Sequence, residues 1–534
     1  MDPSVNPILQ TMDCLPLEII ANIALYLPKW LEDNGSATDA QLVRPAIASL
    51  SRKWQFSVEP AVFREIKLKS TELDEFASVF STSQSHRRRL LKILVFNIVL
   101  PTYSDDDCAM YETDPDRLAN SKAASEAVTA LFDVLSRWGS NSGAAIDLCI
   151  AMHSPMDNAH RGMDKYEQDR ADSIIGRSND IFEERYRCSY IRILDPDKLP
   201  VAPCIKSLAP HGGERRFHPS ALVTLTAKAA PALERVLWQY SESDVYLALR
   251  REMRNEFVQS LKTFRLGPSA RAFAVYITSH NYQDKQRLPN LVFPHRLDPL
   301  CSALHRMVGN NVEKLYYTGQ IDPSFFWPYA EGEDPDLFWS SVDDLIVEFD
   351  MASPCGRGYF RGRPDDEFNV PASDEPLPPE TVGHKPPGYS SAEETQAALV
   401  YERSMQPVGR EGDGTFDSRD DFRRVPNDEV MVPMLEAFAR AAAQMRALTS
   451  VYLATRVKNI TGDNGEWFVS YLAPGKASGF EEYIMDEDAV LSKPRVFFHV
   501  LDWRPSKELV DLFRIVGRER HQQDAIITFL PWLY

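Results

Sequence analysis

The sequence predicts an α/β protein in which a short helical module precedes an irregular solenoid of alternating strands and helices. Two patterns of helical period open the chain, a short apolar motif then recurs along it, and helical stripes precede several copies of that motif. At roughly 150 residues per domain, the 534 residues could form about three to four domains or one long repeat domain. With 44% hydrophobic and 25% charged residues, the chain can bury a large core.

The first helical pattern begins near Leu15 and ends at Pro28. Pro16 suits a first helical turn, where its missing N–H would have no partner, and Glu18 complements the positive end of the helix dipole. One apolar stripe then follows at helical spacing, namely Ile19, Ile20, Ile23, Ala24 and Leu27. We expect an amphipathic helix here.

The second helical pattern is entered through Asp39, a residue type suited to an N-cap. Pro45 must then lie in the first turn or kink the helix, because proline lacks the N–H that the helix interior requires. The pattern predicts a second helix whose apolar stripe is Val43, Ala46, Ile47, Leu50 and Trp54.

A motif of the form apolar-x-x-apolar-x-apolar recurs after these helices. Several neighbouring copies are about 28 to 30 residues apart, close to the period of leucine-rich repeats, in which each unit contains one strand and one helical segment. Chance also produces such triplets, because apolar residues are common in this chain. The copies are Phe63/Ile66/Leu68, Leu91/Leu94/Phe96, Cys188/Ile191/Ile193, Leu233/Val236/Trp238, Leu261/Phe264/Leu266, Val312/Leu315/Tyr317, Val342/Leu345/Val347 and Leu448/Val451/Leu453.

Helical stripes before some copies raise the motif above chance. One stripe precedes Leu448, with Pro433 placed for a first turn, and another precedes Val312. The alternation favours an irregular leucine-rich-repeat-like α/β solenoid, with an ordinary multi-domain α/β fold as the alternative.

The chain is therefore divided into a helical module with its connector (1–68), a repeat region (69–350), an insertion (351–428), and terminal repeats with a cap (429–534). The insertion is rich in proline and acidic residues and is expected to be disordered, since it can bury little apolar surface. Residues 102–120 and 153–178 are expected to be smaller insertions of the same kind. The apolar end of the chain, 529–534, is expected to dock on the last repeat.

Charge and cysteine usage narrow the class of protein. A net charge of −18, from 59 basic and 77 acidic residues, repels phosphate backbones, so we expect no nucleic-acid partner. The seven cysteines include no CxxC pair, which predicts reduced thiols in a cytoplasmic or nuclear protein. No signal-peptide pattern and no apolar run of about eighteen residues is present, so we expect no membrane partner.

No catalytic template matches the sequence, which predicts a protein without enzymatic activity, cofactor or metal. The P-loop, the Gly-x-Ser-x-Gly elbow and His-Glu-x-x-His are all missing. We interpret His295 and His305 as surface or packed histidines, residues 105–107 as a solvated acidic loop, and residues 87–89 as a solvated helix end. A hydrolase with an unrecognised site stays as a minor alternative.

Aromatic residues are plentiful near the expected strand ends. Most are expected to pack in the core, although any on the concave side of a solenoid could anchor a protein substrate. They are Trp238, Tyr240, Tyr316, Tyr317, Phe325, Phe326, Trp327, Trp339 and Trp503.

The beginning of the chain resembles an F-box. Residues 15–27 read Leu-Pro-Leu-Glu-Ile-Ile-Ala-Asn-Ile-Ala-Leu-Tyr-Leu, similar to the Leu-Pro-x-Glu-Ile start of that motif. Residues 50–54, Leu-Ser-Arg-Lys-Trp, resemble its later Arg-x-Trp element. The whole chain is similar to fungal F-box proteins that carry a long leucine-rich-repeat-like region.

The resemblance implies a non-catalytic, substrate-recognition subunit of a Skp-cullin-F-box ubiquitin ligase. Its N-terminal helices would bind the Skp-type adaptor, and through it the cullin ligase, while the solenoid would bind a protein substrate. The residues implied to bind the adaptor are Leu15, Pro16, Ile19, Ile23, Leu27, Leu42, Leu50 and Trp54. The alternative is an interaction scaffold with a vestigial F-box and no ligase recruitment.

Overall fold

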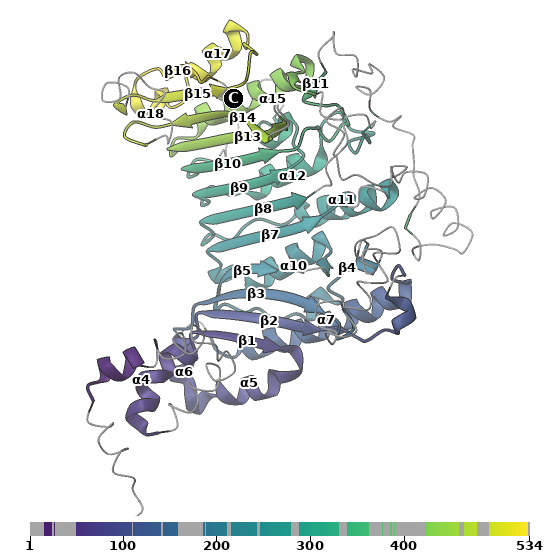
Figure 1. The fold of residues 1–534 in the computed structure, drawn as a ribbon, viewed down its shortest axis with the longest axis vertical. Coiled ribbons are helices and arrows are strands. Elements are labelled where there is room, and N and C mark those ends of the chain that lie inside the picture. Colours follow the sequence, from purple (N-terminus) through teal and green to yellow (C-terminus); the bar gives the residue numbers. More distant parts are fainter. Residues whose placement is uncertain are drawn as a thin grey trace, which may run out of the picture.

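The computed structural model shows a mixed α/β protein built on one large sheet (Figure 1). It describes residues 15–23, 26, 50–108, 110–139, 143–157, 185–186, 188–210, 215–242, 246–278, 288–329, 339–362, 376, 385–386, 389, 423–458, 464–477 and 491–531.

The large sheet has 12 strands, and their order in space follows their order in the chain. Neighbouring strands are parallel, except that β14 runs antiparallel to both of its neighbours. The strands are β1 (Glu65–Lys69), β2 (Ile93–Val99), β3 (Ile146–His153), β5 (Ile205–Pro210), β7 (Arg235–Ser241), β8 (Ala272–Thr278), β9 (Lys314–Gly319), β10 (Asp344–Phe349), β13 (Ser450–Lys458), β14 (Asn464–Leu472), β15 (Arg495–His499) and β16 (Ile526–Phe529).

Two small sheets stand apart from the large one. Strand β4 (Tyr190–Ile191) pairs with β6 (Arg216–Phe217), and β11 (Phe360–Arg361) pairs with β12 (Val425–Pro426). The helices are α4 (Arg52–Val62), α5 (Leu73–Val79), α6 (Ser85–Leu90), α7 (Asp114–Ser136), α10 (Pro219–Ala229), α11 (Leu247–Lys262), α12 (Pro299–Met307), α13 (Pro323–Phe326), α15 (Asp428–Gln444), α17 (Lys507–Arg514) and α18 (Arg518–His521).

Helices cover one face of the sheet, so the core forms between two layers. In β2, β3 and β10 every second side chain is buried and the others are partly or fully exposed. The strand pairing aligns the buried positions in rows across the sheet, because side chains alternate between the two faces of a strand. One row runs through Leu94, Leu148, Leu208, Val236, Phe273, Leu315, Leu345 and Val451.

The recurring motif marks several of these strands. Copies that begin at Phe63, Leu91, Leu233, Val312, Val342 and Leu448 place their last two residues in β1, β2, β7, β9, β10 and β13. The copy at Leu261 is wrong, since it spans the end of α11 and the coil that follows. The copy at Cys188 falls at β4, in a small separate sheet, and the motif missed β3, β5 and β8.

The structure also differs from the expected domain ranges. Strand β1 belongs to the large sheet, although four of its five residues fall within the range 1–68 assigned to the helical module. The insertion expected over 102–120 is wrong in its last part, because α7 begins at Asp114. Its N-cap, Thr113, accepts a hydrogen bond from Asp116 N and donates one to the Asp116 carboxylate at 2.9 Å. This reciprocal cap, followed by Pro115, starts a helix within a polar stretch.

Two expected segments lie mainly outside the described residues. Of the insertion 351–428, the structure describes 351–362, four isolated positions and 423–428; of 153–178, it describes only 153–157. The end of the chain docks as expected through its described part. Phe529 belongs to β16, and Leu530 packs in a cluster with Phe468 and Phe497.

Candidate partner-binding surface

The two described N-terminal helical segments pack on each other through a small core of their own. Residues 17–23 are helical, and α4 follows after Ser51, whose hydroxyl accepts a hydrogen bond from Trp54 N. Ile20, Trp54 and Val58 are at most 1% exposed and form one cluster. Lys53 Nζ donates to Leu15 O over 2.6 Å, so a polar contact joins the same two segments.

The helix expected from Asp39 to Trp54 differs from the observed one. Helix α4 begins at Arg52, so Trp54 lies in its first turn instead of its last, and the helix continues to Val62 with Pro60 inside it. Residues 27–49, which carry most of the expected stripe, lie outside the described residues. The sequence missed α4 because Pro60 is unfavourable within a helix.

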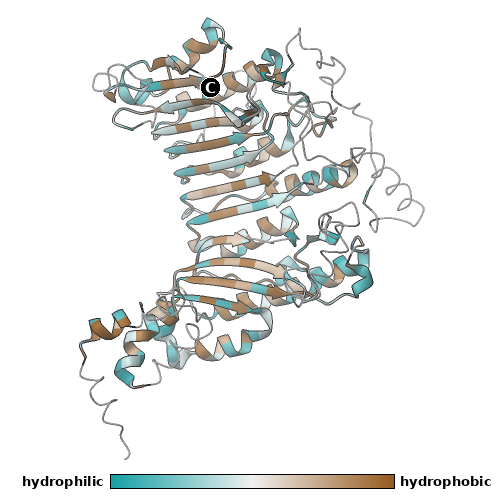
Figure 2. Ribbon diagram, in the orientation of Figure 1, coloured by the Kyte–Doolittle hydropathy of each residue, from teal (hydrophilic) through white to brown (hydrophobic). Residues whose placement is uncertain are grey.

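Several large apolar side chains of these segments remain exposed. Leu17, Ile19, Tyr26, Leu50 and Phe56 are 43%, 44%, 63%, 38% and 72% exposed, and only six other large apolar residues of the described chain are exposed. Figure 2 shows the first helix, at the purple end of Figure 1, as mainly hydrophobic ribbon. We call these five residues the N-terminal apolar surface. Exposed apolar residues on two segments that pack on each other make these segments a candidate site for another macromolecule.

The described residues among those implied by the resemblance fall into three groups. Pro16, Ile19 and Leu50 are exposed, Leu15 and Ile23 are half-buried against the small core, and Trp54 is buried within it. Leu27 and Leu42 lie outside the described residues. Trp54 therefore holds the helices together and presents almost no surface of its own.

Three exposed residues, Leu17, Tyr26 and Phe56, were not among those implied. Leu17 and Tyr26 belong to the quoted motif, but the apolar stripe alone did not include them. Phe56 lies in α4, which the sequence did not predict.

A buried carboxylate joins α4 to α6. Glu59 accepts hydrogen bonds from Arg87 Nη2 at 2.7 Å and from Gln55 Nε2 at 2.9 Å, and His86 Nε2 lies 3.0 Å away. Burial raises the pKa of Glu59, but the hydrogen bonds from Arg87, Gln55 and His86 outweigh it and hold the pKa below its usual value.

Residues 87–89 are therefore not simply a solvated helix end. Arg88 Nε donates to Phe80 O at 2.8 Å, and its guanidinium lies 5.5 Å from the centre of the Trp138 ring. Arg87 pairs with Glu59, so two of the three arginines make contacts that join α6 to other segments.

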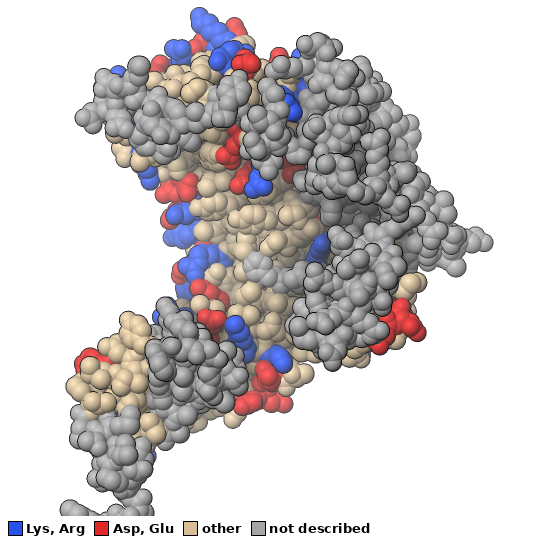
Figure 3. Space-filling model, viewed as in Figure 1, with Lys and Arg blue, Asp and Glu red and all other residues tan. Residues whose placement is uncertain are grey.

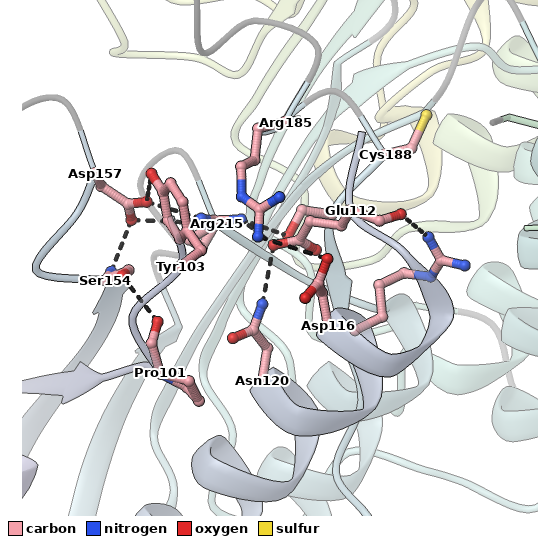
Figure 4. Close-up of polar contacts among 12 residues, drawn as sticks. Pro101, Tyr103, Glu112, Asp116, Asn120, Ser154, Asp157, Arg185, Cys188 and Arg215 are labelled. Atoms are coloured by element: carbon pink, nitrogen blue, oxygen red, sulfur yellow. Dashed lines mark hydrogen bonds and ion pairs between the residues drawn. The ribbon is translucent and has the colours of Figure 1, made fainter. Parts of the chain in front are cut away.

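A second concentration of polar groups follows the carboxyl ends of the strands. Tyr103 and Asp157 come after β2 and β3, and both approach Arg215 (Figure 4). Arg215 forms ion pairs with Glu112 and, over 2.7 Å, with Asp157, while Tyr103 donates to Asp157 over 2.9 Å. All three charged side chains are at most 3% exposed.

A similar network lies farther along the same edge. Arg254 pairs with Glu242 over 2.7 Å and with Asp298 over 2.6 Å, and Arg250 pairs with Glu242 over 2.6 Å. Burial and the nearby Asp298 raise the pKa of Asp322 to about 6. In both networks the carboxylates neutralise the arginines, so this part of the edge holds loops together instead of offering a free charge to a ligand.

The other candidate residues have structural roles. His305 is buried, Nδ1 lies 2.9 Å from Phe325 O, and burial lowers its pKa to about 4. The acidic residues 105–107 form a short 3-10 turn in which Asp107 accepts from Ser104 Oγ. His295 is exposed in a loop. Within the described ranges, no His, Cys, Asp and Glu side chains group as a metal site requires.

Most of the aromatic candidates belong to the core. Trp238, Tyr240, Tyr317, Phe325, Phe326 and Trp339 are buried, and Trp327 and Trp503 pack partly buried against the same core. Tyr316 instead points to the face of the sheet without helices. On that face its strand neighbours are Ala274 and Ile346, and Tyr276 is an exposed aromatic residue that the sequence did not single out.

In Figure 3 the surface over the middle strands carries few charged side chains, whereas acidic and basic groups gather where the strands begin. Arg235, for example, pairs with Asp147 over 2.7 Å. The open face thus offers a mainly uncharged area bordered by ion pairs.

Comparisons with known proteins add no family. No protein-family model matches the chain, and no curated protein is significantly similar to it. Among the helices that the structure describes, none is long and apolar enough to cross a membrane.

Proposed function

We propose that this protein is a non-catalytic substrate-recognition subunit of a Skp-cullin-F-box ubiquitin ligase. Its N-terminal helices would bind a Skp-type adaptor, and its α/β region would bind a protein substrate in the cytoplasm or nucleus. The observation that carries the proposal is the N-terminal apolar surface, which lies on the segments whose sequence resembles an F-box.

The energetics of this surface support a protein partner. Full burial of one large apolar side chain contributes about 1.5–3 kcal/mol, and these five are already partly covered, so burying the rest would contribute roughly 4–8 kcal/mol. Association costs about 4–15 kcal/mol. The apolar surface could therefore supply much of the binding energy, but polar contacts or further residues must supply the remainder.

The sheet supports a leucine-rich-repeat-like solenoid for the second half of the proposal. Strands follow each other in chain order, helices alternate with them on one face, and equivalent apolar residues occupy equivalent positions in successive strands. A solenoid grows by stacking such units and leaves a long open face. We propose that the protein substrate binds this face, near Tyr276 and Tyr316.

The alternative is a scaffold with a vestigial F-box, which would bind partners through the open face without recruiting a ligase. Co-purification of the full-length chain with a Skp-type adaptor separates the two functions. Ile19→Asp should abolish adaptor binding and leave the fold intact, because Ile19 is exposed. Ile23 is a less suitable position for this substitution, because it is half-buried against the small core.

Val201→Asp is the matched control, since Val201 is 46% exposed and lies outside the N-terminal helices. Equal adaptor recovery with both variants would contradict adaptor binding through this surface. No adaptor with the wild-type chain would favour the scaffold.

A further inference from the structure

A cavity of about 220 Å³ lies on the helical side of the molecule, away from the N-terminal apolar surface. The first turns of α7, the segment around β4 and one face of α11 surround it; these elements lie together in Figure 1. Its apolar walls include Tyr190, Leu194, Leu249 and Met253. Nothing in the proposed ligase function uses this cavity.

His218 contributes a buried polar atom to the cavity. Its side chain is 1% exposed, and Nε2 has no hydrogen-bond partner among the described residues. Nδ1 lies 2.7 Å from Ser220 Oγ and accepts a hydrogen bond from Ser220 N at 3.3 Å, and the second contact requires Nδ1 without a proton. Burial, assisted by Arg192, lowers the pKa of His218 to about 3, so the ring is neutral and its proton is on Nε2.

The Nε2–H group is therefore a donor that lacks a good acceptor. A Glu256 carboxylate oxygen lies 3.4 Å away, but it accepts from Arg192 Nη1 over 2.5 Å. Buried donors are normally satisfied, by the protein or by ordered water.

Two ion-paired guanidinium groups line the same cavity. Arg117 is 10% exposed and pairs with Asp114, which also lines the cavity and is 71% exposed. Arg192 also lines the cavity and is 43% exposed. Both guanidinium groups already pair with carboxylates, and Glu256, at 37% exposed, is slightly less exposed than Arg192. A ligand carboxylate at Arg192 must therefore take the place of Glu256.

The volume limits the size of a ligand. At about 30 Å³ for each water molecule, 220 Å³ corresponds to roughly seven waters, or an organic molecule of roughly ten non-hydrogen atoms. Apolar walls with a few convergent polar groups are typical of small-molecule sites.

We infer that this cavity binds a small monocarboxylate with an apolar body. The carboxylate would accept hydrogen bonds from His218 Nε2 and Arg192, displacing Glu256, and the apolar body would contact Leu249 and Met253.

Three probes of equal length test the inference in calorimetric titrations of the full-length chain: octanoate, octanamide and octylamine. Octanoate should bind saturably at one site, at least tenfold tighter than octanamide, and octylamine should not bind. Arg192→Gln should remove that tenfold preference while leaving the affinity for octanamide unchanged. Arg271→Gln is the matched control, because Arg271 is a 54% exposed arginine paired with Glu313 outside the cavity.

Two blocking variants locate the site. Met253→Trp fills the cavity from α11, and Leu118→Trp covers it from an exposed position on α7, so the second stays informative if the first unfolds. Either folded variant should weaken octanoate binding at least tenfold, and Ile19→Asp should leave it unchanged.

Absence of saturable octanoate binding, or binding that Arg192→Gln and Leu118→Trp do not alter, would overturn the inference. The adaptor experiment is unaffected by either result, so failure of one proposal is distinguishable from failure of the other.

Discussion

The N-terminal helical segments and the large sheet bury apolar residues on very different scales. Three fully buried side chains hold the N-terminal helical segments together, whereas the large sheet and its helices share one continuous core. That core includes residues of every large-sheet strand from β1 to β15. The N-terminal helical segments leave large apolar residues exposed. The region of the large sheet, with its helices and loops, buries even charged side chains such as Arg215 and Arg254. A small unit with a small core is suited to gain stability from a partner, and a large core is stable alone.

Breaking a buried ion pair in the sheet region should have the largest effect. Arg254→Ala leaves Glu242 and Asp298 buried without that partner, so the free energy of unfolding should fall by about 3–5 kcal/mol. Denaturant titration measures this change. Arg271→Ala is the exposed control and should cost at most about 1 kcal/mol. Equal losses of unfolding free energy in Arg254→Ala and Arg271→Ala would contradict the expected difference between a buried and an exposed ion pair.

Truncating one large core residue in each region tests whether the regions unfold separately. Phe273→Ala, in the middle of the sheet, should lower the global free energy of unfolding by about 3–5 kcal/mol through the cavity it leaves. Trp54→Ala should instead speed hydrogen exchange in α4 and leave exchange in β7–β9 unchanged. Faster exchange in both regions after Trp54→Ala would show that they unfold together.

Acid should destabilise the sheet region through buried histidines. The pKa of His305 falls from 6.5 to about 4 on folding because burial disfavours its charged form. Below pH 6.5 the unfolded chain therefore binds a proton that the folded chain does not, and stability decreases as the pH falls toward 4.

Between pH 7 and pH 5, His305 should lower the free energy of unfolding by up to about 2 kcal/mol. The raised pKa of Asp322 acts in the opposite direction, because folding there favours proton uptake as the pH falls toward 4. Wild type and His305→Gln both contain Asp322, so comparing their free energies of unfolding at each pH cancels the contribution of Asp322. An identical pH slope in the two proteins would contradict the role of His305.

The smallest effect is expected at the start of α4. Ser51→Ala removes the hydroxyl that accepts from Trp54 N at 3.4 Å, which should cost about 0.5–1 kcal/mol within the helical segments alone. Ser51→Asp, a side chain that also caps, should restore helix stability measured by hydrogen exchange. Loss of stability with both variants would point to a different role for Ser51.

Several features of the fold could be predicted from the sequence because they depend on local patterns. The pairs Leu315/Tyr317 and Leu345/Val347 lie in strands as expected, since alternating apolar residues suit a sheet covered on one face. The triplet at Leu261 fails because the end of an amphipathic helix can show the same spacing. Helix α4 was missed because Pro60 is unfavourable inside a helix.

The candidate sites were less predictable. Arg215 meets Glu112 and Asp157 only because loops after different strands converge, and His218, Arg117 and Met253 come from separate segments around one cavity. No local spacing links such residues.

The amino-acid sequence by itself determined the α/β class, the strand positions marked by apolar alternation, and the apolar character of the first helix. Those properties follow from hydrophobic period and backbone preference, which act over a few residues. Only the tertiary structure decided that Ile20 and Trp54 are enclosed while Ile19 stays exposed, and that buried arginines meet their carboxylates. Burial and charge pairing depend on contacts between distant segments, which exist only after the chain has folded.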